Sequence, residues 1–211
     1  VVIGQNADFS NWQGDIKITG DNTNSRTSPY GVTVNGPLNT RGLDMEGVSS
    51  LIINTTGSVL ASGNGPTEGQ EVRTTGTGKV VVKTSNTSSG SFMAKNATHP
   101  VNTSFQRSLD QTNSNSATEW TLIGIPVAGE TLADLESEGK LATNGSKVGL
   151  GYFDNATGQW TTYTSGASVT LTQMKGYHAT PANSGTSITL EGTMLQAGWT
   201  VSYTHLTLPT S

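Results

Sequence analysis

The chain has 211 residues, of which 12% are charged and 26 are glycine, and its formal net charge is -4 at pH 7. Its length suits one large or two small domains, and its low charge argues against ordinary disorder, which couples low hydrophobicity to high net charge. An acidic chain offers no basic face for phosphates, so nucleic acid is not expected as a partner. The lack of cysteine excludes disulfides, thiolate metal ligands and a cysteine nucleophile.

The apolar runs of the chain are all well short of the roughly 20 residues that a membrane-spanning helix needs, so no membrane span is expected. The sequence begins at Val1 without a charged and apolar leader. We therefore expect that a signal peptide was removed or was never captured in this sequence.

The composition predicts an all-β fold, because Thr and Gly are abundant while the residues that build helices are scarce. In residues 1–96, short apolar pairs with a period of two mark strands of about four to six residues between Gly and Asn turns. Their spacing is irregular, so a β-solenoid-like repeat region or a meander is predicted here, with a sandwich as the competing architecture. The pairs are Ile16 and Ile18, Val32 and Val34, Leu43 and Met45, Leu51 and Ile53, and Val80 and Val82.

Two carboxylates alternate with one of these apolar pairs. Asp44 and Glu46 follow Leu43 and Met45 in turn, so the period of two places the acids on the opposite face from the apolar side chains. The alternation predicts a solvated acidic face. A general acid and base is a distant second interpretation, because nothing nearby would separate the two pKa values.

A polar stretch over residues 86–118 predicts a domain boundary, and residues 97–200 are predicted to form an antiparallel β-sandwich-like module, truncated at its end. Its densest apolar run is EWTLIGIPV at residues 119–127. Trp120 and Leu122 project to one face and Ile123 to the other, so both faces are largely apolar. This pattern predicts an interior strand that is covered on both sides.

One short helix is predicted directly after that run. Thr131 can cap its N-terminus with Asp134 three residues on, and Gly139 offers the C-terminal stop. Further strands are predicted at residues 148–154, 159–164, 169–171, 176–180 and 186–191, the first two joined by a hairpin loop over residues 155–158.

The order of four motifs in this half resembles a module of secreted Bacteroidetes surface proteins. In those proteins, similar segments lie ahead of a C-terminal sorting domain that the type IX secretion system reads. The resemblance covers roughly residues 105–198, implies an extracellular or cell-surface location in a bacterium, and carries over no catalytic residue. The motifs are WTLIGIPV at residues 120–127, YFDNATGQW at 152–160, KGYHAT at 175–180 and ITLEGTM at 188–194.

The last residues have an unusual composition. VSYTHLTLPT at residues 201–210 looks like the in-frame translation of a sequencing adapter derived from a transposon end. We interpret residues 201–211 as a non-native tail that interrupts a strand beginning near Trp199, and a natural terminal strand is the alternative. Recovery of this tail in uninterrupted genomic sequence would refute the adapter interpretation.

No catalytic or cofactor-binding set is predicted. His99, His178 and His205 lack a second histidine or a carboxylate at the spacing of a zinc or iron motif, so neither a metal site nor a cofactor is expected. His178 is interpreted as a strand residue on an exposed or half-buried face. No nucleophile elbow is present, and the chain is predicted not to be an enzyme.

Aromatic residues provide the remaining functional signal. Trp160, Tyr163 and Tyr177 are candidate glycan-stacking residues, although a strand places Trp160 and Tyr163 on opposite faces and burial is favoured for rings of this size.

Three functions remain open at this point. We expect a noncatalytic extracellular structural or adhesive segment of a larger bacterial surface or secreted protein, with surface glycans or other surface proteins as partners. The alternatives are a carbohydrate-binding module, which needs an exposed aromatic row, and a fragment of a β-helical polysaccharide-degrading enzyme, which needs convergent carboxylates in a groove.

Overall fold

A computed structural model describes residues 2–3, 15–20, 30–47, 49–63, 72–85, 87–95, 97, 99–109, 120–183 and 185–194. Strands dominate this part of the chain, and its one helix has six residues. The predicted all-β fold is therefore confirmed. None of the helices among these residues has the length and apolar character that a membrane span requires. The predicted tail at residues 201–211 and the strand near Trp199 lie outside the described residues.

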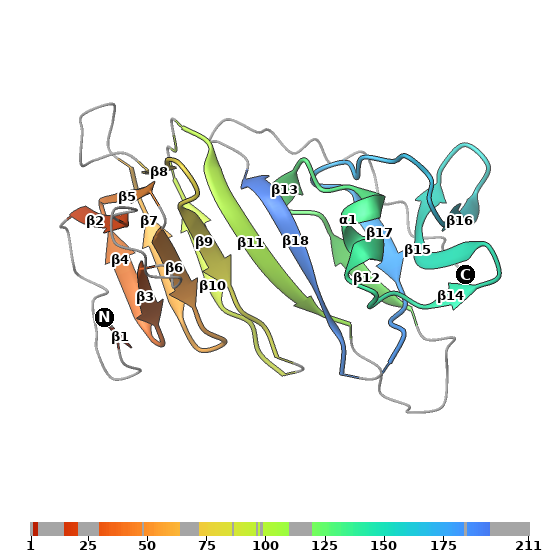
Figure 1. Cartoon of the computed structure of the whole chain (residues 1–211), viewed down its shortest axis with the longest axis horizontal. Helices are drawn as coiled ribbons and strands as arrows, with labels where there is room; N and C mark the ends of the chain where they lie inside the picture. The colour runs from red at the N-terminus through yellow and green to blue at the C-terminus, as the bar shows by residue number, and fades with distance from the viewer. Residues whose placement is uncertain are drawn as a thin grey trace, which may run out of the picture.

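In the first half the chain forms three sheets whose strands pair in parallel, and each sheet contains one strand from each of three successive coils (Figure 1). β1 (Val2–Ile3) pairs in parallel with β3 ahead of the first coil. This stacking is a β-solenoid, one of the three architectures left open for these residues by the sequence. The coils are β2 (Asp15–Gly20), β3 (Tyr30–Val34) and β4 (Pro37–Thr40); β5 (Gly42–Gly47), β6 (Ser49–Ile53) and β7 (Ser58–Ala61); and β8 (Val72–Thr74), β9 (Lys79–Val82) and β10 (Ser91–Ala94).

The apolar pairs read from the sequence lie in these strands, and the described side chains among them pack in or against the solenoid interior. Leu43, Met45, Leu51, Ile53 and Val80 are all less than 2% exposed. The sequence showed no strict period because the connections between strands differ in length from coil to coil. Along one sheet, partner residues are 19 positions apart between β3 and β6 but 29 apart between β6 and β9.

Asparagine and glycine shape one corner of the solenoid. The Asn54 side-chain amide donates a hydrogen bond to the Asn35 side-chain oxygen of the preceding coil. A Cβ on Gly57 would lie 2.3 Å from the carbonyl oxygen of Val34, so only glycine fits where two coils approach this closely.

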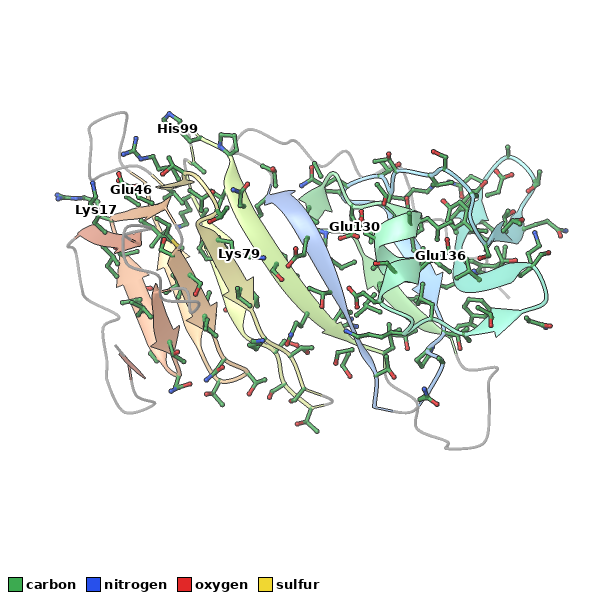
Figure 2. All side chains as sticks on the ribbon, in the orientation of Figure 1. Lys17, Glu46, Lys79, His99, Glu130 and Glu136 are labelled. Atoms are coloured by element: carbon green, nitrogen blue, oxygen red, sulfur yellow. The ribbon has the colours of Figure 1, made fainter. Side chains whose placement is uncertain are left out.

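The prediction of a solvated acidic face is wrong for Asp44. Its side chain is 2% exposed and accepts two hydrogen bonds from the Arg73 guanidinium, at 3.0 and 2.9 Å. The cause is the stacking of coils, because the parallel register aligns Asp44 with Lys17 on one side and Arg73 on the other. Glu46 remains partly exposed and pairs with Lys17 at 3.0 Å (Figure 2).

One long strand joins the two halves. β11 (Val101–Ser108) pairs in parallel with β9 and antiparallel with β18 (Ser187–Met194), so a single seven-stranded sheet runs from the solenoid into the second half. Phe105, in β11, packs against the apolar clusters of both halves. The change from parallel to antiparallel pairing falls just after the boundary predicted at residue 97.

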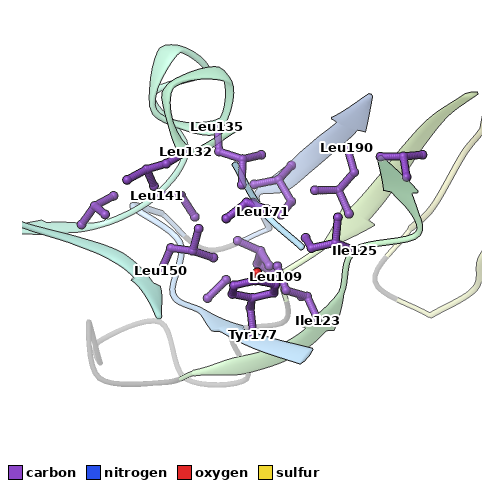
Figure 3. Packing of buried hydrophobic residues seen from close by; sticks show 14 residues of the cluster. Leu109, Ile123, Ile125, Leu132, Leu135, Leu141, Leu150, Leu171, Tyr177 and Leu190 are labelled. Carbon is purple, nitrogen blue, oxygen red and sulfur yellow. The ribbon is translucent and has the colours of Figure 1, made fainter. Parts of the chain in front are cut away.

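The second half closes over its own core with a curled antiparallel sheet. Side chains from this sheet, from β18 and from the helix pack together (Figure 3). The elements are β12 (Thr121–Gly124), β13 (Val127–Ala128), α1 (Leu132–Ser137), β14 (Thr143–Asn144), β15 (Lys147–Asp154), β16 (Gln159–Thr164) and β17 (Gly176–Ala179). The strand order in this sheet is β12, β17, β15 and β14. β16 also pairs with β15, outside this order.

The prediction that EWTLIGIPV is one interior strand is wrong. The run breaks at residues 125–126, so that β12 lies at the edge of the curled sheet while β13 joins the long sheet beside β18. Ile123 is buried, but Leu122 is 68% exposed. The apolar residues on the second face of β12 therefore belong to a surface, because no described element covers them.

The predicted helix is confirmed with its capping residues. The Thr131 hydroxyl accepts a hydrogen bond from the Asp134 N–H at 3.1 Å, and the Asp134 carboxylate accepts one from the Thr131 N–H. Gly139 has a φ of +64° after the C-terminus. The hairpin of β15 and β16 also forms as predicted. Residues 169–171 form no strand, because only Thr170 makes an isolated bridge, to Thr131.

Candidate functional site

The outer face of the curled sheet carries large exposed apolar side chains. The inward residues Ile123 and Tyr177 are buried in the core, and strand alternation turns their neighbours outward. The outward residues are Trp120, Leu122, Phe153 and Trp160, with exposures of 43%, 68%, 42% and 53%. They come from β12, β15, β16 and the residue before β12, at the end of the molecule away from the solenoid (Figure 1).

A three-ring stack lies at the centre of this face. The imidazole of His178 lies between two indoles, with its centroid 4.0 Å from Trp120 and 4.3 Å from Trp160. The interplanar angles are 20° and 17°, so the three rings are nearly parallel. Phe153 and Trp160 form a T-shaped pair with their ring centroids 5.4 Å apart. Residues far apart in sequence thus form one aromatic surface, which we call the Trp–His–Trp stack.

Gly151 makes room for this stack. It pairs with His178 across β15 and β17, and with Thr162 across β15 and β16. A Cβ at Gly151 would lie 2.2 Å from the Nε2 atom of His178 and 2.4 Å from the Thr161 carbonyl oxygen. The missing side chain therefore lets the imidazole lie over β15, within reach of Trp160 on the next strand.

His178 acts here as a flat neutral spacer. The prediction of an exposed or half-buried face is wrong for His178, which is only 7% exposed because the two indoles cover it. Its Nε2 atom has no hydrogen-bond partner among the described residues. Burial lowers the pKa of His178 below its ordinary value of 6.5, because a buried site disfavours the charged imidazolium. The imidazole is therefore uncharged at neutral pH.

A groove of about 420 Å³ borders the indole of Trp120 on the same face. Gly149 and Thr180 contribute to its lining, and a Cβ at Gly149 would lie 2.6 Å from the Thr180 carbonyl oxygen. The hydroxyl of Thr180 lies beneath the surface without a hydrogen-bond partner in the described part of the chain. The remaining lining residues are Ala142, Thr143, Asn144, Lys147, Val148 and Thr162.

The three predicted stacking residues do not form one platform. Trp160 is exposed and belongs to the stack, whereas Tyr163 packs beside Tyr152 at a ring distance of 5.5 Å. Trp160 and Tyr163 thus lie on opposite faces, as the strand period predicted. Burial raises the pKa of Tyr163 to about 12. Tyr177 is 1% exposed and its hydroxyl accepts the N–H of Thr172 at 2.8 Å, so it is a core residue and cannot present its ring to a glycan.

Sequence reasoning missed Trp120 and His178 as members of this site. The sequence pattern predicts a strand at both positions, but their contact depends on the order of β12, β17, β15 and β16 in the sheet, and Trp120 lies just before β12. The glycines at 149 and 151, alternating within an otherwise apolar strand, were the available signal, because such glycines often mark a close approach.

The carboxylates of the described residues mainly accept hydrogen bonds from, or form ion pairs with, other groups of the protein. Glu130 and Glu138 accept hydrogen bonds from the N–H groups of Glu191 and Thr189, where no described strand pairs with β18 on that side. Burial raises the pKa of Glu130 to about 7. Figure 2 shows Glu130 beside α1.

Two other hollows each have a single carboxylate among their described lining residues, from Glu136 and from Glu191. A glycosidase needs two flanking carboxylates, so these hollows do not favour the enzyme alternative. No group of three or more His, Asp or Glu side chains suited to a metal ion occurs among the residues described.

Comparisons with family models, curated proteins and solved structures gave no match for this chain.

Proposed function

We propose that this chain is a noncatalytic, adhesive segment of a larger extracellular bacterial protein, and that it binds carbohydrate through the outer face of the curled sheet. The observation that carries the proposal is the Trp–His–Trp stack, which presents two indoles that are 43% and 53% exposed. Because large aromatic side chains are usually buried, two adjacent exposed indoles indicate a binding surface.

The chemistry around the stack suits a sugar. Indole faces pack against the apolar C–H faces of sugar rings, and hydroxyl and amide groups bind the sugar hydroxyls. The groove beside Trp120 offers Thr143, Asn144 and Thr162 for such hydrogen bonds. A mainly apolar site with a few placed polar groups is the usual form of a small-molecule site.

A protein partner is the second candidate. Leu122 is 68% exposed and Phe153 is 42% exposed on the same face, and exposed apolar patches also mark protein interfaces. The hydroxyl and amide groups in the lining of the adjacent groove favour the saccharide.

The solenoid serves in this proposal as a spacer or stalk. Its parallel coils join the curled sheet through β11, so the binding face lies at one end of a continuous scaffold. The resemblance to modules of type IX secreted proteins supports an extracellular bacterial origin. Export by the type IX secretion system is part of the proposal.

A glycan array probed with the full chain tests the function. We expect selective binding that falls at least tenfold in Trp120→Ala and Trp160→Ala, since aromatic anchors dominate binding at such sites. Met93→Ala is the matched control, because Met93 is 57% exposed but lies on β10 of the solenoid. Absence of glycan binding by the wild-type chain, or full binding by both tryptophan variants, would contradict the proposal.

A further inference from the structure

We propose that the groove beside Trp120 selects a negatively charged sugar, with a uronic-acid or sulfated residue bound by Lys147. The inference rests on the proposed function and names its ligand class. Among the described residues that line the groove, Lys147 is the only charged one. An anionic sugar would therefore meet an ammonium group and no opposing carboxylate from the described lining residues.

Lys147 differs from most cations whose contacts are described, because it lacks an acidic partner. Its Nζ atom contacts the Thr164 hydroxyl at 3.3 Å and the Thr162 carbonyl oxygen at 3.5 Å, both of which are neutral. By contrast, Lys17 and Arg73 pair with Asp44 and Glu46, Lys79 with Glu191, and Lys140 with Glu138. In the described part of the chain no carboxylate pairs with the Lys147 ammonium, so its charge is available to bind an anionic ligand.

The placement of Lys147 lets one ligand contact both the ammonium and the indole. Lys147, Gly149 and Gly151 alternate along β15 on the outer face. The Thr180 side chain lies over Gly149 and the His178 imidazole lies over Gly151, so the two glycines keep the floor between the ammonium and the stack low. Four residues of strand cover roughly 13 Å. A short oligosaccharide can therefore lie on this floor with one ring against Trp120 and an acidic group near Nζ.

Charge complementarity favours a saccharide acid over a neutral sugar. The chain as a whole carries a formal charge of -4, so its net charge does not attract anions. An unpaired cation in a groove without carboxylates creates a local positive potential that attracts them. A charge-assisted hydrogen bond is also stronger than a neutral one.

Isothermal titration calorimetry with matched probes tests this inference. The probes are an oligogalacturonide, its fully methyl-esterified neutral form, a sulfated oligosaccharide and a poly-glutamate peptide. We expect at least one acidic saccharide to bind and the ester to bind about tenfold more weakly than its acid, as one charge-assisted hydrogen bond implies. The poly-glutamate peptide is expected to bind much more weakly, because it has no sugar ring to stack on Trp120.

Variants test whether Lys147 causes the difference in affinity between the acidic saccharide and its ester. Lys147→Gln should weaken binding of the acidic saccharide about tenfold and leave the ester unchanged. Lys95→Gln, a solvent-exposed lysine at the end of β10, makes the same change in net charge and should leave both affinities unchanged. Trp120→Ala should weaken both ligands.

The outcomes separate the two proposals. Equal binding of the acid and the ester, or an acid affinity unaffected by Lys147→Gln, overturns the charge inference and leaves the carbohydrate function standing. Poly-glutamate binding as tight as that of the acidic saccharide also overturns the inference. If neither these probes nor a glycan array gives binding, the proposed function fails as well.

Discussion

At the scale of single residues, the binding face depends on one missing side chain. Gly151 lies under the imidazole of His178, which in turn spaces the two indoles. The platform is therefore built by cross-strand packing, because the strands around Gly151 bring the three rings together.

Gly151→Ala should separate the rings and destabilise the fold. Its Cβ would lie 2.2 Å from His178 Nε2 and 2.4 Å from a backbone oxygen, and overpacking of this kind costs about 1 to 3 kcal/mol. Urea unfolding measures the loss of stability, and near-ultraviolet circular dichroism reports the tryptophan environment. Gly176→Ala is the control, since nothing lies within 4 Å of its Cβ position. Equal stability of the two variants would disprove the packing role.

A second residue-scale feature is the protonation of Glu130. Its carboxyl group is 2% exposed and accepts the N–H of Glu191, and burial raises its pKa from 4.5 to about 7. The folded state therefore holds a proton that the unfolded state releases between these two pH values.

The free energy of unfolding should fall as pH rises from about 4.5 to about 7. The contribution is fully present below pH 4.5 and lost once Glu130 ionises in the folded state, with an upper size of about 3 kcal/mol. Glu130→Gln should remove this part of the slope, because a neutral amide can still accept the N–H bond. Glu136 is a half-buried residue of α1, and Glu136→Gln should keep this part of the pH dependence. The measurement is urea unfolding at several pH values, and an unchanged slope in Glu130→Gln would contradict the assignment.

At the scale of elements, charge alternates from coil to coil on one sheet of the solenoid. Lys17, Asp44 and Arg73 occupy aligned positions in β2, β5 and β8. Asp44 is the buried centre of this ladder, while Glu46 at its side remains partly exposed. The ladder fixes the register of three strands, because a shift by one residue would separate every pair.

Asp44→Ala should destabilise the chain by about 3 kcal/mol, since it leaves Arg73 without its main partner and opens a buried site. Glu46→Ala, in the same strand and ladder, should cost about 1 kcal/mol or less because its pairs are more exposed. Thermal and urea unfolding of both variants provide the comparison. Similar losses in the two variants would show that burial of the pair does not set its contribution.

At the scale of the whole molecule, one sheet connects the two apolar clusters. The seven-stranded sheet passes from β9 through β11 to β18, and Phe105 contacts both clusters from β11. Because the halves share backbone hydrogen bonds and a side chain, we expect them to unfold together.

Hydrogen exchange measures this coupling. Amides of β6 and β15, one strand from each half, should exchange with the same opening free energy in the wild-type chain. Phe105→Ala removes the shared contact, should cost about 2 to 4 kcal/mol, and should lower protection in both halves. Different opening free energies in the wild-type chain would indicate two independent units.

The sequence by itself determined the local elements. The period of two in the apolar pairs located strands β2, β3, β5, β6 and β9, and the capping residues located α1. These signals are readable because they depend on neighbours along the chain, such as Thr131 and Asp134. The same local pattern correctly placed Trp160 and Tyr163 on opposite faces of β16.

Only the tertiary structure decided which faces are covered and which residues meet. EWTLIGIPV has the composition of an interior strand, yet the chain leaves the curled sheet at residues 125–126 and exposes one face of β12. Asp44 is buried because coil stacking brings Arg73 to it from 29 residues away. The Trp–His–Trp stack joins Trp120, Trp160 and His178 through strand order. Long-range pairing of this kind leaves no period in the sequence, since it is set by which strands become neighbours.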